Sequence, residues 1–199
     1  ANGKPFARYW MHNAFLNING EKMAKSAGNF FTVRDIAAKY DLQVLRFFML
    51  SAHYRSPLNF SDELMASAKS GLDRIVNAAQ NLDFLLKREG LEEGFKEGED
   101  PDFAKEYTSK FEDAMDDDCN TADAISAVFE FVRAINSEVN EQSSVSFVKL
   151  AKERLVKLCD ILGIITEKPE DDLDSEVEEM IAQRQAARKA KDFAAADAI

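Results

Sequence analysis

The residues best suited to chemistry are two lysines three positions apart in a run of small residues. Lys22 and Lys25 bracket Met23, and most positions around them are small: Ala24, Ser26, Ala27 and Gly28. A lysine ammonium is a compact charge on a flexible stem, which suits contact with phosphate groups. Cations held in place stabilise the negative charge that builds on a triphosphate as pyrophosphate leaves. The segment predicts a phosphate-contacting loop, although two lysines on a turn can also be ordinary solvated charges.

The residues before this segment predict a hairpin that would position it. Residues 15–18 alternate apolar and polar side chains, and Asn19-Gly20 is a dipeptide that tolerates positive φ in a tight turn. After the lysines, Thr32 and Asp35 form a capping-box pattern at the start of a short helix. A second, mostly apolar helix is expected over residues 44–49, and residues 51–59, which include Pro57, are expected to form a loop.

The rest of the chain predicts an antiparallel helix bundle. Four stripes of apolar residues recur at steps of three or four, as on one face of a helix. The first begins after Ser61, a good N-cap. The stripes are Leu64, Ala68, Leu72, Ile75, Ala79, Leu82 and Leu86; Phe103, Tyr107, Phe111 and Met115; Ile125, Val128, Val132, Ile135 and Val139; and Phe147, Leu150, Leu155, Leu158 and Leu162. Residues 90–101 are expected to form an exposed loop within the bundle.

The fold class is therefore predicted as mainly α, with four regions. Residues 1–31 would hold the hairpin and lysine loop, 32–60 a small helical region, 61–167 the bundle, and 168–199 a linker with the start of a further helical domain. The linker is expected at residues 168–174, because Pro169 stands there among acids. Ser175 and Glu178 then resemble a capping box. We expect the chain to be part of a longer protein.

Charge and cysteine usage restrict the partners. The net charge is -11, but residues 1–60 hold eight Lys and Arg against three Asp and Glu, whereas residues 61–199 hold 17 against 33. An anionic partner would be met mainly by the first third, and non-specific DNA binding is disfavoured. Cys119 and Cys159 have no CxxC spacing, so we expect two small core residues and no metal site. The sequence has no membrane-spanning or signal pattern, which favours the cytoplasm.

The lysine segment closely resembles a known signature. KMAKSAGNF is similar to the KMSKS loop of class I aminoacyl-tRNA synthetases, which helps to activate an amino acid with ATP. YWMHNAF before it and FTVRDIAAKYDLQVLRFFMLSAHYRSPLNFS after it resemble the cysteinyl-tRNA synthetases. Residues 116–124 resemble that family's DALR-type helical domain, and RQAARKAKDFAAADA resembles the segment that enters its anticodon-binding domain. Residues 32–60 would then be its stem-contact region.

The resemblance implies roles for individual residues. Lys22 and Lys25 would be the catalytic lysines that contact ATP, with Lys25 the stronger candidate, and Met23 and Ser26 would shape the loop. Ala24 stands where the family pattern has Ser, which removes one hydroxyl and leaves the charges unchanged. The implied partners are tRNA-Cys, cysteine and ATP with magnesium. The longer protein would join cysteine to its tRNA through cysteinyl adenylate.

The family's nucleotide-binding Rossmann domain, His-Ile-Gly-His motif and zinc ligands would precede Ala1, and none has a counterpart in the sequence. We therefore expect this chain to be inactive alone, because positioning and electrostatic stabilisation must act together.

Two groups of basic residues are further candidates. Arg55, beside His53 and Tyr54, could touch the inside of a bent tRNA or could instead pair with a carboxylate. A second cluster could face tRNA or could be a solvated helix face: Arg184, Arg188, Lys189 and Lys191.

Two alternative functions stay open. One is the related ligase of mycothiol synthesis, which passes activated cysteine to a sugar amine, but the segment resembling the entry to an anticodon domain argues against it. The other is a helical interaction module without catalytic function, which would require the signature matches to be coincidences.

Overall fold

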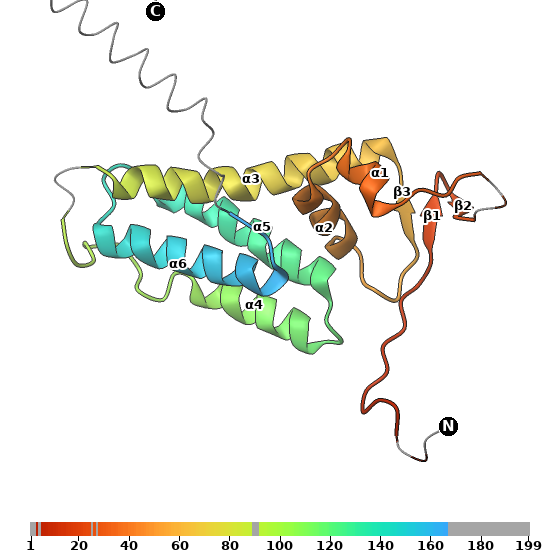
Figure 1. Ribbon diagram of the computed structural model, residues 1–199. Coiled ribbons are helices and arrows are strands. Elements are labelled where there is room, and N and C mark those ends of the chain that lie inside the picture. Colours follow the sequence, from red (N-terminus) through yellow and green to blue (C-terminus); the bar gives the residue numbers. More distant parts are fainter. Residues whose placement is uncertain (1–2, 4, 25, 27, 89–91, 167–199) are drawn as a thin grey trace, which may run out of the picture. The chain divides into compact units, whose positions relative to one another are not determined.

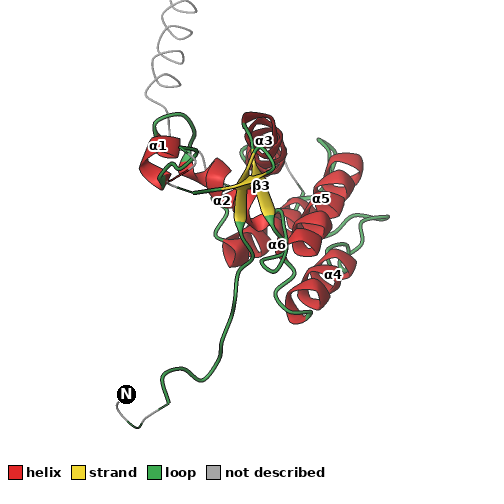
Figure 2. Ribbon diagram, turned by 90° about the vertical axis from the view of Figure 1, so that its right-hand side faces the viewer, coloured by secondary structure: helices red, strands yellow, loops and turns green. Residues whose placement is uncertain are grey.

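The computed structural model describes residues 3, 5–24, 26, 28–88 and 92–166, and these belong to one compact unit, Ala1–Thr166. They form a bundle of four longer helices with a small sheet and two short helices at one end (Figures 1 and 2). The predicted linker, the capping box at Ser175 and the last helices lie outside the described residues. The mainly helical fold class is confirmed.

The small sheet begins with the predicted hairpin. β1 (Leu16–Ile18) pairs antiparallel with β2 (Glu21–Lys22), and Asn19 and Gly20 have φ of 50° and 83° in the turn between them. β3 (Leu58–Phe60) pairs in parallel with β1 on its other side. The loop predicted for residues 51–59 was therefore wrong at its end, because the residues after Pro57 complete a sheet whose partner strand lies far earlier in the chain.

Two short helices follow the hairpin as predicted. α1 (Val33–Ala37) has the capping box, in which the Asp35 amide donates to Thr32 Oγ1 and the Thr32 amide donates to the Asp35 carboxylate. α2 (Leu42–Leu50) is capped by Asp41 and buries Val44, Phe47 and Phe48. These side chains pack α2 against the first half of α3, so α2 is part of the same core as the bundle.

The bundle consists of α3 (Asp62–Leu86), α4 (Lys105–Asp116), α5 (Thr121–Glu138) and α6 (Val145–Leu162). Ser61 caps α3 as predicted, through a hydrogen bond from the Leu64 amide. The first stripe was wrong at its start, since Leu64 is 43% exposed while Met65 is fully buried. Both residues fit a helical step to Ala68, so periodicity alone cannot choose between them. The second stripe was also wrong at its start: Phe103 is buried, as expected, but it lies before the first residue of α4.

Loops complete the bundle. Residues 92–101, the described part of the loop predicted before α4, have no helix or strand and are mostly exposed; Glu99 joins them to the start of α6 by accepting hydrogen bonds from the Ser144 amide and hydroxyl. Of the two cysteines, Cys159 is a core residue, and burial raises the pKa of its thiol to about 12. The same expectation for Cys119 was wrong. It is exposed and has a φ of 55° because it lies in the turn between α4 and α5.

Arg46 of α2 closes the far end of α6. Its Nε donates to the carbonyl of Leu162 at 2.8 Å, which places a positive charge at the helix C-terminus. Gly163 follows with a φ of 64°, and a Cβ there would lie 2.5 Å from Arg46 Nη2. The glycine is therefore required both by backbone conformation and by the guanidinium that covers it.

We expect Gly163→Ala to destabilise the protein by more than the roughly 1 kcal/mol that left-handed backbone costs a non-glycine residue, because Arg46 must also move. Gly98→Ala is the matched control, since Gly98 has a φ of 90° but no atom lies within 4 Å of the place that a Cβ would take. Urea unfolding of both variants would give the two free energies. Equal losses would show that the contact with Arg46 contributes nothing.

Candidate functional site

The lysine segment leaves the sheet from a hairpin turn that is fastened to β3. Gly20 donates its amide to Asn59 Oδ1 at 2.7 Å, and the Asn19 amide donates to the Phe60 carbonyl at 3.1 Å. The type of turn that joins two strands by Asn-Gly requires positive φ at both central residues, and both have it. The start of the lysine segment is thus fixed to a strand far away in sequence.

Asn29 closes the segment at its other end. Its side-chain oxygen accepts a hydrogen bond from the Ala24 amide at 2.9 Å, and its Nδ2 donates to the Lys22 carbonyl at 3.2 Å. One side-chain amide therefore bridges both backbone groups next to Met23. Sequence reasoning did not assign this role, although Asn is a residue that commonly bonds backbone in turns. The bond at Ala24 uses the backbone, so it does not depend on the hydroxyl that Ala24 lacks.

The predicted site residues of the segment differ in exposure. Lys22 is exposed, and its Nζ lies 4.9 Å from the centre of the Phe15 ring. Within the described residues no carboxylate lies within ion-pair distance of Lys22. Met23 is half-buried and Ser26 is exposed, while Lys25 lies outside the described residues. The Lys22 ammonium is therefore open to solvent and to an anionic ligand.

Three consecutive residues converge on one carboxylate. Arg55 Nη2 lies 3.0 Å from Asp118 Oδ2, and Tyr54 donates its hydroxyl to Asp118 Oδ1 at 2.7 Å. His53 Nε2 lies 3.7 Å from the same carboxylate, and its ring stacks on Tyr54. The hydrogen bond to Asp118 raises the pKa of the Tyr54 hydroxyl. The contact joins the loop before β3 to the turn between α4 and α5.

Arg55 therefore has the carboxylate partner that was one of its two predicted alternatives, yet its side chain is still 66% exposed. The other basic candidates, Arg184, Arg188, Lys189 and Lys191, lie outside the described residues.

Comparisons with known proteins agree with these features. The model of the tRNA synthetases class I (C) catalytic domain matches residues 1–70, and the DALR domain model matches residues 110–166. Cysteine-tRNA ligase of Lachnospira eligens is 55% identical over 201 residues, which is all of this chain and 42% of that protein. The chain is homologous over its whole length to cysteine-tRNA ligases, and it carries matches to the class I tRNA synthetase catalytic domain and to the DALR domain.

Two further curated relatives and one solved structure also resemble this chain. The cysteine-tRNA ligases of Lachnoclostridium phytofermentans and Clostridioides difficile are 52% and 49% identical, over 99% and 100% of the chain. The chain thus spans about two fifths of the length of these curated relatives. A solved structure, the ternary complex of Agrobacterium radiobacter LeuRS with tRNA and LeuAMS, covers 80% of this chain and 24% of its own, with a TM-score of 0.58 and 18% identity. That likeness shows a shared fold.

The predicted resemblance to the cysteinyl-tRNA synthetases and to a DALR-type domain is confirmed by these matches. Within the described part of this chain, no three His, Cys, Asp or Glu side chains gather as metal ligands. None of its described helices is long and apolar enough to cross a membrane.

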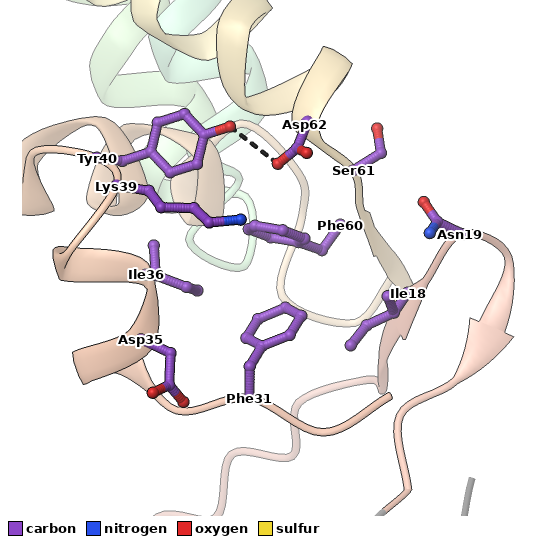
Figure 3. Close-up of a pocket in the computed structure, with 10 residues that line it drawn as sticks. All are labelled: Ile18, Asn19, Phe31, Asp35, Ile36, Lys39, Tyr40, Phe60, Ser61 and Asp62. Carbon is purple, nitrogen blue, oxygen red and sulfur yellow. Dashed lines mark hydrogen bonds between the residues drawn. The ribbon is translucent and has the colours of Figure 1, made fainter. Parts of the chain in front are cut away.

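A hollow of about 260 Å³ lies between the small sheet and α1 (Figure 3). Ile18, Phe31 and Phe60 supply apolar walls, and Tyr40 donates its hydroxyl to Asp62 at 2.9 Å across one side. Two carboxylates, those of Asp35 and Asp62, line it. Lys39 also lines the hollow, so its walls hold one ammonium against two carboxylates and are poorly suited to a phosphate group.

We expect Asn29→Ala to speed amide hydrogen exchange at Ala24, because the amide loses its acceptor. Asn29→Asp is the matched control: it keeps an oxygen for the Ala24 amide and removes only the donor to Lys22. Exchange followed by NMR would then show strong loss of protection for the alanine variant and a smaller loss for the aspartate variant. Unchanged exchange in both would remove Asn29 from the closure of the segment.

Proposed function

We propose that this chain is the carboxy-terminal part of a cysteine-tRNA ligase, in which it supplies the signature lysines and a helical surface for tRNA-Cys. The homologues named above support the parent activity. The single observation that best supports the site assignment is the exposed Lys22 side chain at the end of β2, in a hairpin whose turn is bonded to Asn59 and whose last residue, Lys22, is bonded to Asn29. Such fixed positioning is what electrostatic catalysis requires.

In the proposed reaction, a carboxylate oxygen of cysteine attacks the α-phosphorus of ATP. The bond from that phosphorus to the bridging oxygen breaks, and pyrophosphate leaves with the electron pair. A terminal ribose hydroxyl of the tRNA then takes the cysteinyl group and releases AMP. Lys22 and Lys25 would stabilise the growing charge on the phosphates, and magnesium bound to ATP would do the same when present. No side chain of this chain needs to act as a nucleophile.

Zinc, implied by the family, does not fit the described residues, which offer no cluster of three suitable ligands. We assign no step of the reaction to a zinc ion held here.

Basic residues outside the lysine segment would contact the tRNA. Arg55 is the candidate among the described residues, since its side chain is 66% exposed while its guanidinium pairs with Asp118. Arg184, Arg188, Lys189 and Lys191 are candidates from the sequence alone. A lysine or arginine on a phosphate releases counterions, so binding should weaken with salt.

We expect the chain to bind cysteine tRNA more tightly than an unrelated tRNA, with an affinity that falls between about 50 and 200 mM salt. Titration of each labelled tRNA, monitored by fluorescence anisotropy, would test this. Equal weak binding to both tRNAs would mean that discrimination between them needs other parts of the longer protein. That result would contradict the proposal that this chain helps to recognise cysteine tRNA. No binding to either would favour the sugar-amine ligase or the interaction module.

We also expect no amino-acid activation by the chain on its own, because the family's Rossmann domain and His-Ile-Gly-His motif have no counterpart in the sequence, and lysines alone do not position ATP. Cysteine-dependent exchange of pyrophosphate into ATP should remain at the level of a Lys22→Gln, Lys25→Gln double variant, which serves as the matched blank. Exchange clearly above that blank would show that the catalytic unit is more complete than proposed.

A further inference from the structure

The turn between α4 and α5 holds two consecutive residues in the left-handed region. Asp118 has a φ of 58° and Cys119 a φ of 55°, a conformation that costs a non-glycine residue roughly 1 kcal/mol or more. Backbone bonds hold the turn to the end of α4: the Cys119 amide donates to the Met115 carbonyl at 3.1 Å, and the Asn120 amide donates to the Ala114 carbonyl at 3.0 Å. The turn lies at the end of the bundle that carries the sheet (Figure 1). The backbone from which the Asp118 side chain extends is therefore fixed by α4.

The Asp118 carboxylate completes a ring of three polar contacts with the 53–55 loop. Tyr54 donates its hydroxyl to one carboxylate oxygen at 2.7 Å, and Arg55 Nη2 lies 3.0 Å from the other. Arg55 Nε also donates to the Tyr54 hydroxyl at 3.1 Å, which closes the ring. Because the Arg55 side chain is 66% exposed, its ion pair contributes little by itself. The hydrogen bond from Tyr54 to a charged acceptor is the stronger contact.

Tyr54 also bonds the residues that lead into β1. Its backbone carbonyl accepts a hydrogen bond from the Ala14 amide at 2.8 Å. The next residue, Phe15, accepts a hydrogen bond from the Leu58 amide at 3.1 Å, and its ring centre lies 4.9 Å from Lys22 Nζ. Tyr54 thus contacts the α4–α5 turn through its hydroxyl and the entry to β1 through its carbonyl.

Packing beneath the 53–55 loop is incomplete. A hollow of about 130 Å³ has Ala14, Phe15, Met49, His53 and Tyr54 among its lining residues. Atoms that border such a space lose the close contacts that would otherwise hold them in place. The hydrogen bonds at the two ends of Tyr54 therefore carry more of the placement of this loop than they would in a filled core.

The contact of Tyr54 with Asp118 joins two parts of the chain that match different domains. Tyr54 and Lys22 lie within the class I catalytic-domain match, residues 1–70, whereas Asp118 lies within the DALR match, residues 110–166. β3 pairs with β1 along its length, and the bond from Ala14 to Tyr54 holds the chain just before it. The hairpin is thereby referred to the helical part by a polar contact as well as by the core.

We infer that Asp118 is a positioning residue for Lys22: by holding Tyr54, it fixes Ala14 and Phe15 at the entry to β1 and so limits the movement of the lysine. This inference rests on the proposed function, because that function assigns Lys22 to the phosphates of ATP. Electrostatic stabilisation depends on charges that are held in place before the reaction. Asp118 acts through Tyr54 and needs no contact with a substrate.

The test uses two variants at Asp118 that differ in one acceptor. Asp118→Gly removes the carboxylate, and glycine adopts a φ of 58° without strain. Asp118→Asn keeps an oxygen for the Tyr54 hydroxyl in a residue type that also tolerates this conformation. Amide hydrogen exchange followed by NMR should be about tenfold faster at Ala14 in Asp118→Gly and within about threefold of the unaltered chain in Asp118→Asn. The amide of Val132, a buried residue of α5, is the internal reference for global stability.

Tyr54→Phe removes only the hydroxyl and should speed exchange at Ala14 as much as Asp118→Gly does. Combining the two changes should add little, because both break the same bond. The Lys22 side chain gives a second readout, since the proton chemical shift of its Cε group reports on the nearby Phe15 ring. Asp118→Gly and Tyr54→Phe should both move this shift toward that of a free lysine. Asp117→Asn removes the same charge one residue earlier in the turn and should leave the shift unchanged.

Faster exchange at Ala14 but not at Val132, together with the change at Lys22, would support the inference. Unchanged exchange at Ala14 in Asp118→Gly would overturn it, and so would a Lys22 shift that stays the same while Ala14 loosens. Equal acceleration at Ala14 and Val132 would also overturn it, because Asp118 would then stabilise only the fold as a whole. Neither readout uses ATP or tRNA, so a failure here is distinct from a failure of the tRNA titrations that test the proposed function.

Discussion

Burial of the apolar face of α3 is the interaction on which the remaining structure depends. Within its 25 residues, α3 contacts α2, α5 and α6 and buries Met65, Leu72, Ile75 and Leu82 almost completely. The sheet end and the bundle end are therefore parts of one core. Apolar burial stabilises by roughly 25 cal/mol per Å², so a face of this length provides the main free energy that holds the two ends together.

Polar contacts then fix how the helices and loops are oriented relative to one another. Arg46 reaches from α2 to the end of α6, and Asp118 reaches from the α4–α5 turn to the 53–55 loop. Each joins residues more than 60 positions apart, and each meets a backbone with positive φ, at Gly163 in one case and at Asp118 itself in the other. Strained backbone persists where its surroundings determine it. These contacts set how the hairpin is presented relative to the helices.

The distribution of charge links structure to function. Residues 61–199 hold 33 Asp and Glu against 17 Lys and Arg, and the hollow between α4 and α5 has three glutamates in its walls beside Lys110 and Arg133. The excess of Lys and Arg over Asp and Glu lies in residues 1–60, within the class I catalytic-domain match, which ends at residue 70. An acidic protein can accommodate a polyanion when its acids lie away from the part that meets it, because electrostatic repulsion falls off over about 10 Å in moderate salt.

The sequence by itself determined the hairpin, both short helices, the bundle and the synthetase signature, because turn dipeptides, caps, helical periodicity and a local motif are encoded by neighbouring residues. Only the tertiary structure decided three other features. β3 forms because β1 offers it a partner, Met65 rather than Leu64 is buried because packing chooses between two positions of equal periodicity, and Cys119 is exposed because α4 ends before it. The contacts of Asn29 and Asp118 also required the fold. Their partners are set by distance in space, which no local pattern specifies.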